Sequence, residues 1–153
     1  MKISLKKWAL FILFPVIVGA IVGFITMQSN DYKDLIQPFF APPGWIFPIV
    51  WTILYILMGV SSCIVSSYNT ENSKNAMKIY IIQLFVNYLW SFFFFLFKLR
   101  TFAFVWILLL VYLVFKMVIA FSKINKTSGF LQIPYMLWVS FATVLNLAIV
   151  LLN

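Results

Sequence analysis

The chain has 153 residues, of which 65% are hydrophobic and 9% are charged, and its mean hydropathy is +1.07. This composition excludes an ordinary soluble domain and predicts a membrane protein. A net charge of +8 would suggest nucleic-acid binding in a soluble chain. Here the cations lie in short gaps between apolar runs, where they act as topology signals, so we expect no nucleic-acid partner.

The content of reactive side chains narrows the chemistry further. The chain contains no His and a single Cys, Cys63. It therefore cannot build a Cys/His metal cluster or an intramolecular disulfide, and it has no histidine to act as a catalytic base. We assign no metal site and no conventional catalytic residues, and leave open whether the protein is an enzyme.

The first predicted helix covers residues 8–27, directly after a segment with three lysines. A cleaved signal peptide is the alternative, but the apolar run continues for the roughly 20 residues that a bilayer crossing needs. We therefore expect a retained membrane helix. Gly19 and Gly23 form a small-xxx-small pair, which favours close helix packing within the bundle over a dimer face.

Residues 28–43 form the longest predicted connection, polar at first and apolar toward Pro42 and Pro43. A connection of this length often carries binding residues, so we interpret it as a lid-like loop. Its acidic residues, Asp31 and Asp34, are expected to be solvated. The proline pair provides a rigid entry to the next helix, because proline fixes φ and lacks a backbone donor.

The second helix is predicted over residues 44–67, with Trp51 and Tyr55 on one face. Residues 68–76 are predicted to form a polar loop, in which Ser73 caps the next helix. The third helix is predicted over 77–97.

Gln83, Asn87 and Trp90 share a stripe of that third helix. Amides at membrane depth either pair across helices or line a polar or ligand-filled cavity, and the sequence leaves both readings open. The phenylalanines at 92–95 are expected to face lipid or the interface.

The fourth and fifth helices are predicted over residues 101–122 and 130–152, separated by a polar loop at 123–129. Trp138, Ala142 and Asn146 follow one another at spacings of four on the last helix. The fold class is therefore all-α, an integral membrane bundle of five transmembrane helices that forms a single domain, 1–153.

Loop cations predict the orientation of the bundle. The larger set lies on the side of the N-terminus and comprises Lys2, Lys6, Lys7, Lys74, Lys78, Lys123 and Lys126, whereas Lys33, Lys98 and Arg100 lie on the other side. The positive-inside rule then places the N-terminus in the cytoplasm, and the C-terminus and the lid-like loop outside.

Three segments together resemble the translocator protein family, also called the tryptophan-rich sensory protein (TspO/MBR) or peripheral benzodiazepine receptor family. They are Pro42-Pro43-Gly44-Trp45-Ile46-Phe47-Pro48 with Val50-Trp51-Thr52-Ile53-Leu54-Tyr55 and Met58-Gly59; Gln83 with Asn87, Trp90 and Ser91; and Pro134-Tyr135-Met136-Leu137-Trp138 with Phe141-Ala142-Thr143 and Leu145-Asn146. The chain looks like a bacterial member, which implies a cell-membrane location.

The resemblance implies a membrane receptor or sensor, often dimeric, with a pocket in each protomer that the first loop closes. Members bind porphyrins such as protoporphyrin IX and haem, cholesterol, and benzodiazepine or isoquinoline-carboxamide ligands, and some bacterial members degrade protoporphyrin IX in light and oxygen. By matching position, the implied ligand-binding residues are Tyr32, Pro42, Pro43, Trp51, Asn87, Trp90, Trp138, Ala142 and Asn146.

The residue chemistry is compatible with these implications. Trp51 and Trp138 would offer flat walls and N–H donors to a tetrapyrrole, although interfacial tryptophan is the alternative reading. Without His as an axial ligand, porphyrin is expected as a ligand or substrate, with no permanently bound cofactor. The tail 147–153 has neither Tyr nor a cation, which argues against sterol binding there. The alternative function is a transporter of tetrapyrroles or other apolar metabolites.

Overall fold

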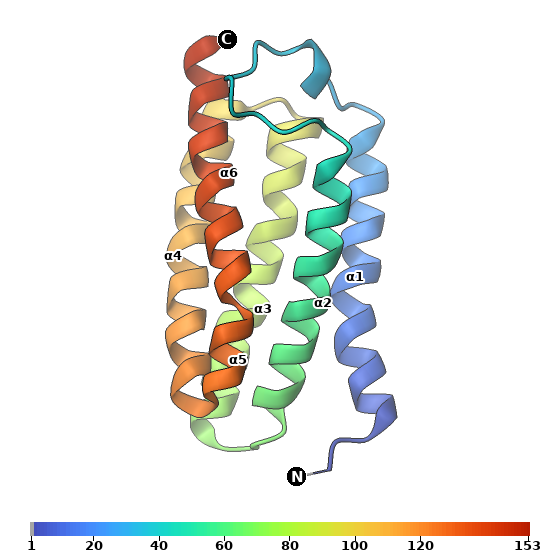
Figure 1. The fold of residues 1–153 in the computed structure, drawn as a ribbon, viewed down its shortest axis with the longest axis vertical. Coiled ribbons are helices and arrows are strands. Elements are labelled where there is room, and N and C mark those ends of the chain that lie inside the picture. Colours follow the sequence, from blue (N-terminus) through green and yellow to red (C-terminus); the bar gives the residue numbers. More distant parts are fainter. Residues whose placement is uncertain (1) are drawn as a thin grey trace.

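A computed structural model describes residues 2–153 of the chain as an all-helical bundle (Figure 1). Within this described part, five helical segments are long and apolar enough to cross a membrane. The elements are α1 (Leu5–Met27), η1 (Tyr32–Asp34), α2 (Ile46–Ser66), α3 (Glu71–Ser91), η2 (Phe92–Leu96), α4 (Arg100–Ile124), α5 (Lys126–Leu131) and α6 (Ile133–Leu152).

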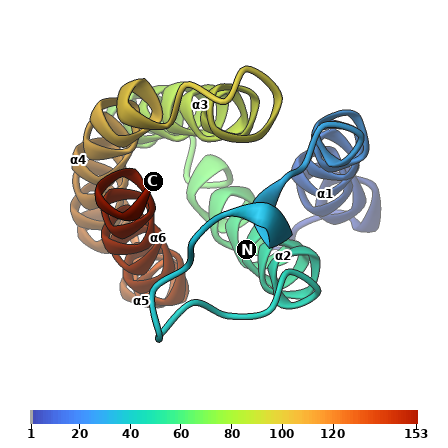
Figure 2. The ribbon, with the colours of Figure 1, turned by 90° about the horizontal axis from the view of Figure 1, so that it is seen from above.

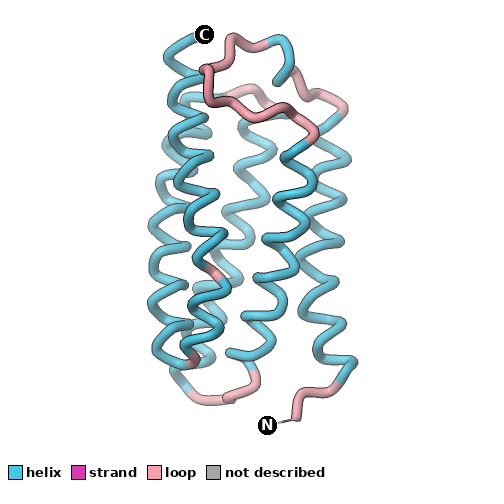
Figure 3. The backbone as a smooth tube through the Cα atoms, viewed as in Figure 1, coloured by secondary structure: helices cyan, strands magenta, loops and turns pink. Residues whose placement is uncertain are grey.

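The helices run up and down the bundle, with the lid-like loop over one end and the N-terminus at the other (Figures 1 and 3). Seen from above, α1 lies at the outside, next to α2, and the lid-like loop passes from α1 toward α6 and back to α2 (Figure 2). Helix α1 packs mainly on α2, α3 packs on α4, and α4 packs on α6. The loop therefore covers the end at which α2, α3 and α6 surround the interior.

Helix α3 begins at Glu71, six residues before the predicted start at Met77. The side chain of Thr70 caps it by accepting a hydrogen bond from the Ser73 backbone N–H at 3.1 Å. Ser73 is therefore not the cap, and its hydroxyl instead donates to the Val65 carbonyl. The polar residues 68–76 lack an apolar stripe and therefore predict a loop, but the Thr70 cap lets the residues that follow it form the first turns of a helix.

The predicted loop at 123–129 is also mostly helical. Helix α4 continues to Ile124, and Asn125 caps the short helix α5 by accepting from the Ser128 N–H at 3.0 Å. Gln132 then separates α5 from α6, which carries Pro134 in its first turn. Proline fits there because the first helical N–H groups have no intrahelical acceptor.

Two glycines allow α1 and α2 to approach closely, but they are not the predicted pair. A Cβ atom at Gly19 would lie 2.3 Å from the ring of Tyr55, and one at Gly59 would lie 2.5 Å from the backbone of Ile12. A Cβ atom at Gly23 would meet nothing within 4 Å. Gly19 thus packs inside the bundle as expected, whereas its close-packing counterpart is Gly59.

We expect Gly59→Ala to destabilise the bundle, because the new methyl group would collide with the α1 backbone. Overpacking of this kind costs about 1–3 kcal/mol. Gly23→Ala is the matched control and should leave stability unchanged or slightly higher, since alanine favours a helix more than glycine does. Thermal unfolding of the detergent-solubilised variants measures both effects, and equal midpoints for the two variants would contradict the assigned contact.

Candidate functional site

A buried chain of hydrogen bonds crosses the middle of the bundle. The Tyr55 hydroxyl donates to Asn87 Oδ1 at 2.9 Å, and Asn87 Nδ2 lies 2.7 Å from the Tyr135 hydroxyl. That hydroxyl donates to Gln83 Oε1 at 2.8 Å. These four buried residues join α2, α3 and α6. The two amides of α3 thus make interhelical hydrogen bonds, one of the two readings that the sequence left open.

A second set of polar contacts lies nearer the lid-like loop. Trp90 Nε1 donates to Asn146 Oδ1 at 3.1 Å, and Asn146 Nδ2 donates to the backbone carbonyl of Arg100 at 3.0 Å. Both side chains are buried. The amide of Asn146 therefore ties α3 and α6 to the first residue of α4.

A small cavity lies beneath the lid-like loop at this level. Its lining residues come from the loop, the start of α2, the end of α3 with η2, and α6: Tyr32, Phe47, Trp90, Phe94, Phe95, Ala142, Leu145 and Asn146. We call it the enclosed cavity. Its volume of about 10 Å³ is room for about one water molecule. In this structure the space beneath the lid-like loop is therefore too small for any organic ligand.

Tyr32 is the residue of the lid-like loop whose side chain is buried against the enclosed cavity. Only 4% of this residue is exposed, its hydroxyl donates to the Pro42 carbonyl at 3.0 Å, and its ring packs edge-on against Phe47 at 5.2 Å between centroids. Burial raises the pKa of the Tyr32 phenol above its ordinary value. The neutral, donating form that holds Pro42 is therefore present at neutral pH and is lost only in strongly alkaline solution.

Further contacts hold the loop down at two other points. Asp31 forms an ion pair with Arg100, so the expectation that both loop acids are solvated is wrong for Asp31, whereas Asp34 is exposed. Asn153 near the end of α6 both accepts from the Ile36 N–H at 3.0 Å and donates to the Ile36 carbonyl at 2.9 Å. The loop is thus attached to α4 and to α6.

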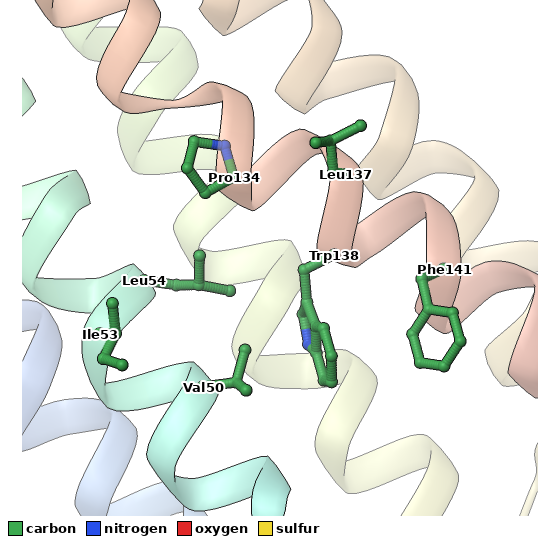
Figure 4. A pocket seen from close by; sticks show the side chains of 7 residues that line it. All are labelled: Val50, Ile53, Leu54, Pro134, Leu137, Trp138 and Phe141. Atoms are coloured by element: carbon green, nitrogen blue, oxygen red, sulfur yellow. The ribbon is translucent and has the colours of Figure 1, made fainter. Parts of the chain in front are cut away.

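A larger groove opens between α2 and α6 and is lined wholly by apolar side chains (Figure 4). Its volume is about 350 Å³, and its lining residues are Val50, Ile53, Leu54, Pro134, Leu137, Trp138 and Phe141. We call it the lateral groove. The Trp138 Nε1–H group is buried but has no hydrogen-bond partner among the described residues. No polar atom of the wall is accessible from the groove, so the groove offers an occupant only apolar and aromatic contacts.

Phe47 lies between the enclosed cavity and the lateral groove. It lines the enclosed cavity and contacts Trp138 of the lateral groove, with ring centroids 5.9 Å apart. It also packs against Tyr32 of the lid-like loop. Phe47 therefore contacts residues of both spaces and of the lid-like loop.

The structure divides the predicted site residues among several places. Four of them line the enclosed cavity: Tyr32, Trp90, Ala142 and Asn146. Trp138 lines the lateral groove, and Asn87 lies in the buried hydrogen-bond chain. The Pro42 carbonyl accepts from Tyr32, Pro43 is exposed, and Trp51 stacks on Tyr55 with ring centroids 5.6 Å apart. Trp51 is therefore one aromatic layer away from the polar chain, on the same helix as much of the groove wall.

Two aromatic residues of the enclosed cavity were missed. Phe94 is 3% exposed, so the expectation that the phenylalanines at 92–95 face lipid or the interface is wrong for Phe94, whereas Phe95 is half-buried. The cause is local, because residues Phe92–Leu96 form a π-helical turn. Such a turn changes the residue spacing and rotates the faces away from a 3.6-residue period. Sequence periodicity alone carries no signal of that rotation.

We expect Asn87→Leu to cost about 1–3 kcal/mol of stability, because it removes the partner of Tyr55 and of Tyr135 in the bundle interior. Phe85→Leu is a suitable control, since Phe85 is exposed on the same helix. Unfolding of both variants in the same detergent measures the difference. A midpoint for Asn87→Leu equal to that of the control would show that the chain of hydrogen bonds contributes little.

Comparisons with known proteins agree with this architecture. The model of the TspO/MBR family matches residues 11–152. The tryptophan-rich sensory protein of Cereibacter sphaeroides is 34% identical over 95% of this chain and 92% of its own length. The tryptophan-rich protein TspO of Chlorobaculum tepidum is 37% identical over 80% of this chain and 78% of its own length. The translocator protein homolog of Schizosaccharomyces pombe is 32% identical over 97% of this chain and 93% of its own length.

Proposed function

The chain belongs to the TspO/MBR family of membrane sensor proteins, and from this premise we propose that it is a receptor for porphyrins such as protoporphyrin IX and haem. The ligand would lie between α2 and α6, against Trp138. Benzodiazepine-type and isoquinoline-carboxamide ligands, which are also flat and largely apolar, would use the same walls.

The observation that carries the proposal is the wholly apolar lateral groove between α2 and α6, with the indole of Trp138 in its wall. An apolar ligand that covers this wall removes apolar surface from water or lipid headgroups, which is favourable. Phe141 lies beside Trp138 with ring centroids 5.3 Å apart. Such a surface suits a flat aromatic ligand that has few polar atoms.

Binding of a tetrapyrrole would require the lid-like loop to move. The lateral groove, at about 350 Å³, lies near the lower end of typical ligand pockets, which run from about 300 to 1,000 Å³. The enclosed cavity would add space once Tyr32 and Phe47 left it. We therefore propose that the closed form described here is the unliganded state and that the loop rearranges over the bound porphyrin.

The proposal extends to the setting of the protein. It is integral to a membrane, and we propose the bacterial cell membrane, with the N-terminus cytoplasmic and the lid-like loop outside. Association into a homodimer is a further part of the proposal. Porphyrin would act as ligand or substrate, with no permanently bound cofactor.

A light- and oxygen-dependent degradation of the bound porphyrin is a second candidate activity. The feature that favours it is the indole of Trp138 in the groove wall, with Trp51 on the neighbouring helix. An electron-rich indole in van der Waals contact with a photoexcited porphyrin is a suitable electron donor. The protein would then contribute position and electron supply in place of acid–base groups.

We expect protoporphyrin IX to quench tryptophan fluorescence of the purified protein in a saturable manner. Trp138→Phe should weaken binding about tenfold, or roughly 1.4 kcal/mol, because the smaller ring loses part of the stacking contact with the ligand. Trp51→Phe should weaken it less, because Trp51 contacts Tyr55. Trp8→Phe at the far end of α1 is the control. No saturable quenching of the unmodified protein would refute the receptor proposal.

For the degradation activity, the complex is illuminated in air while the porphyrin absorbance is followed. We expect faster loss than in detergent alone and a slower rate for Trp138→Phe at saturating porphyrin. Loss at the same rate with and without protein would leave binding as the only activity.

A further inference from the structure

Asp31 of the lid-like loop is shared by two cations of the turn between η2 and α4. One carboxylate oxygen contacts the Arg100 guanidinium, and the other lies 3.7 Å from Lys98 Nζ. The side chain of Arg100 is 16% exposed and that of Asp31 is 24% exposed, so this ion pair is largely shielded from water. Two positive charges therefore face one negative charge where the lid-like loop meets the start of α4.

The guanidinium of Arg100 is only partly satisfied by Asp31. Its Nε–H group is buried and has no hydrogen-bond partner in the part of the chain that the structure describes. Its central carbon lies 5.5 Å from the ring centroid of Phe94, which lines the enclosed cavity. Because guanidinium presents its donors as a fork, the unused Nε–H shows that Asp31 in this position leaves one donor of that fork unpaired.

The backbone fixes Arg100 to the same site. Its carbonyl accepts from Asn146, and Asn146 accepts from Trp90, so the residue that carries the cation is tied to two walls of the enclosed cavity. Arg100 is thus placed by the bundle, whereas Asp31 belongs to the loop that must move.

We propose that Arg100, assisted by Lys98, is the binding site for the carboxylates of an acidic apolar ligand, and that Asp31 occupies this site in the closed, unliganded form. The inference rests on the porphyrin-receptor function proposed above and specifies its ligand class as carboxylate-bearing. A ligand carboxylate that replaces Asp31 keeps the cations paired and releases the loop from α4. The exchange conserves charge pairing, so neither state leaves the buried guanidinium without an anion.

The proposal distinguishes between ligands of the same shape. Protoporphyrin IX carries two propionates on one edge of a flat apolar ring, whereas its dimethyl ester has the same ring without the charges. An uncharged ligand can occupy the lateral groove but cannot displace Asp31. Acidic ligands should therefore gain affinity from Arg100 and release the loop, whereas neutral ones should not.

The test compares the affinity of the diacid and of the dimethyl ester in detergent at fixed low salt. We expect the unmodified protein to prefer the diacid about tenfold, or roughly 1.4 kcal/mol. Arg100→Gln should abolish this preference by weakening the diacid alone. Lys98→Gln, at a half-exposed side chain, should reduce the preference in part, which keeps the test valid if Arg100→Gln does not fold.

Two further variants sharpen the comparison. Asp31→Asn removes the competing carboxylate, so the diacid should bind more tightly and its preference over the ester should rise. Lys33→Gln makes the same charge change as Lys98→Gln but at an exposed position of the lid-like loop, and it should leave the preference unchanged.

The outcomes separate this inference from the proposed function. Equal affinity for diacid and ester in the unmodified protein, or a preference that survives both Arg100→Gln and Lys98→Gln, would overturn the carboxylate site and leave the receptor intact. Failure of both ligands to bind would overturn the receptor proposal, and the carboxylate site with it.

Discussion

The need to satisfy polar groups inside a membrane underlies the arrangement of this protein. Lipid offers no hydrogen-bond partner, so a buried amide or phenol must find one on another helix. Tyr55, Asn87, Tyr135 and Gln83 do this for one another across α2, α3 and α6. These hydrogen bonds link the three helices, the enclosed cavity lies on the lid side of that polar layer, and the lateral groove extends from its level toward the lid. The site is thus built on a layer whose side chains already have partners.

Outside this layer, several buried polar groups have no partner among the described residues, and two of them lie on the lid side. The Trp138 N–H and the Arg100 Nε–H are both buried without partners among the residues described. Native proteins rarely leave buried donors unpaired unless a ligand, an ion or water completes them. The two donors differ in kind, since one is a neutral indole in an apolar groove and the other belongs to a cation at the start of α4. The aromatic groove wall and the Arg100 cation are the features on which the proposed flat, acidic ligand depends.

Much of the site could be predicted from the sequence, mainly through its resemblance to a known family. Trp90, Ala142 and Asn146 also fall on helix stripes, whereas Tyr32 is implied by the resemblance alone, and all four line one enclosed cavity. The ion pair of Asp31 was not predictable, because it joins residues 69 positions apart through a loop with no regular period. Phe94 was misplaced because a π-helical turn changes the period on which any prediction of helix faces depends. Thr70 was overlooked as a cap because the helix that it starts is polar for its first turns.

The sequence by itself determined that this chain lies in a membrane, that it is all-helical, and that aromatic and amide side chains gather on particular helices. These properties follow from composition and from short-range periodicity, which are local. Only the tertiary structure decided which amides satisfy one another, which tryptophan is left with a free donor, and how the loop is held closed. Those outcomes depend on the relative rotation of the helices and on contacts between distant residues. The pairing of Asp31 with Arg100 and the close approach of α1 to Gly59 are of this kind, because each is set by where a whole helix lies.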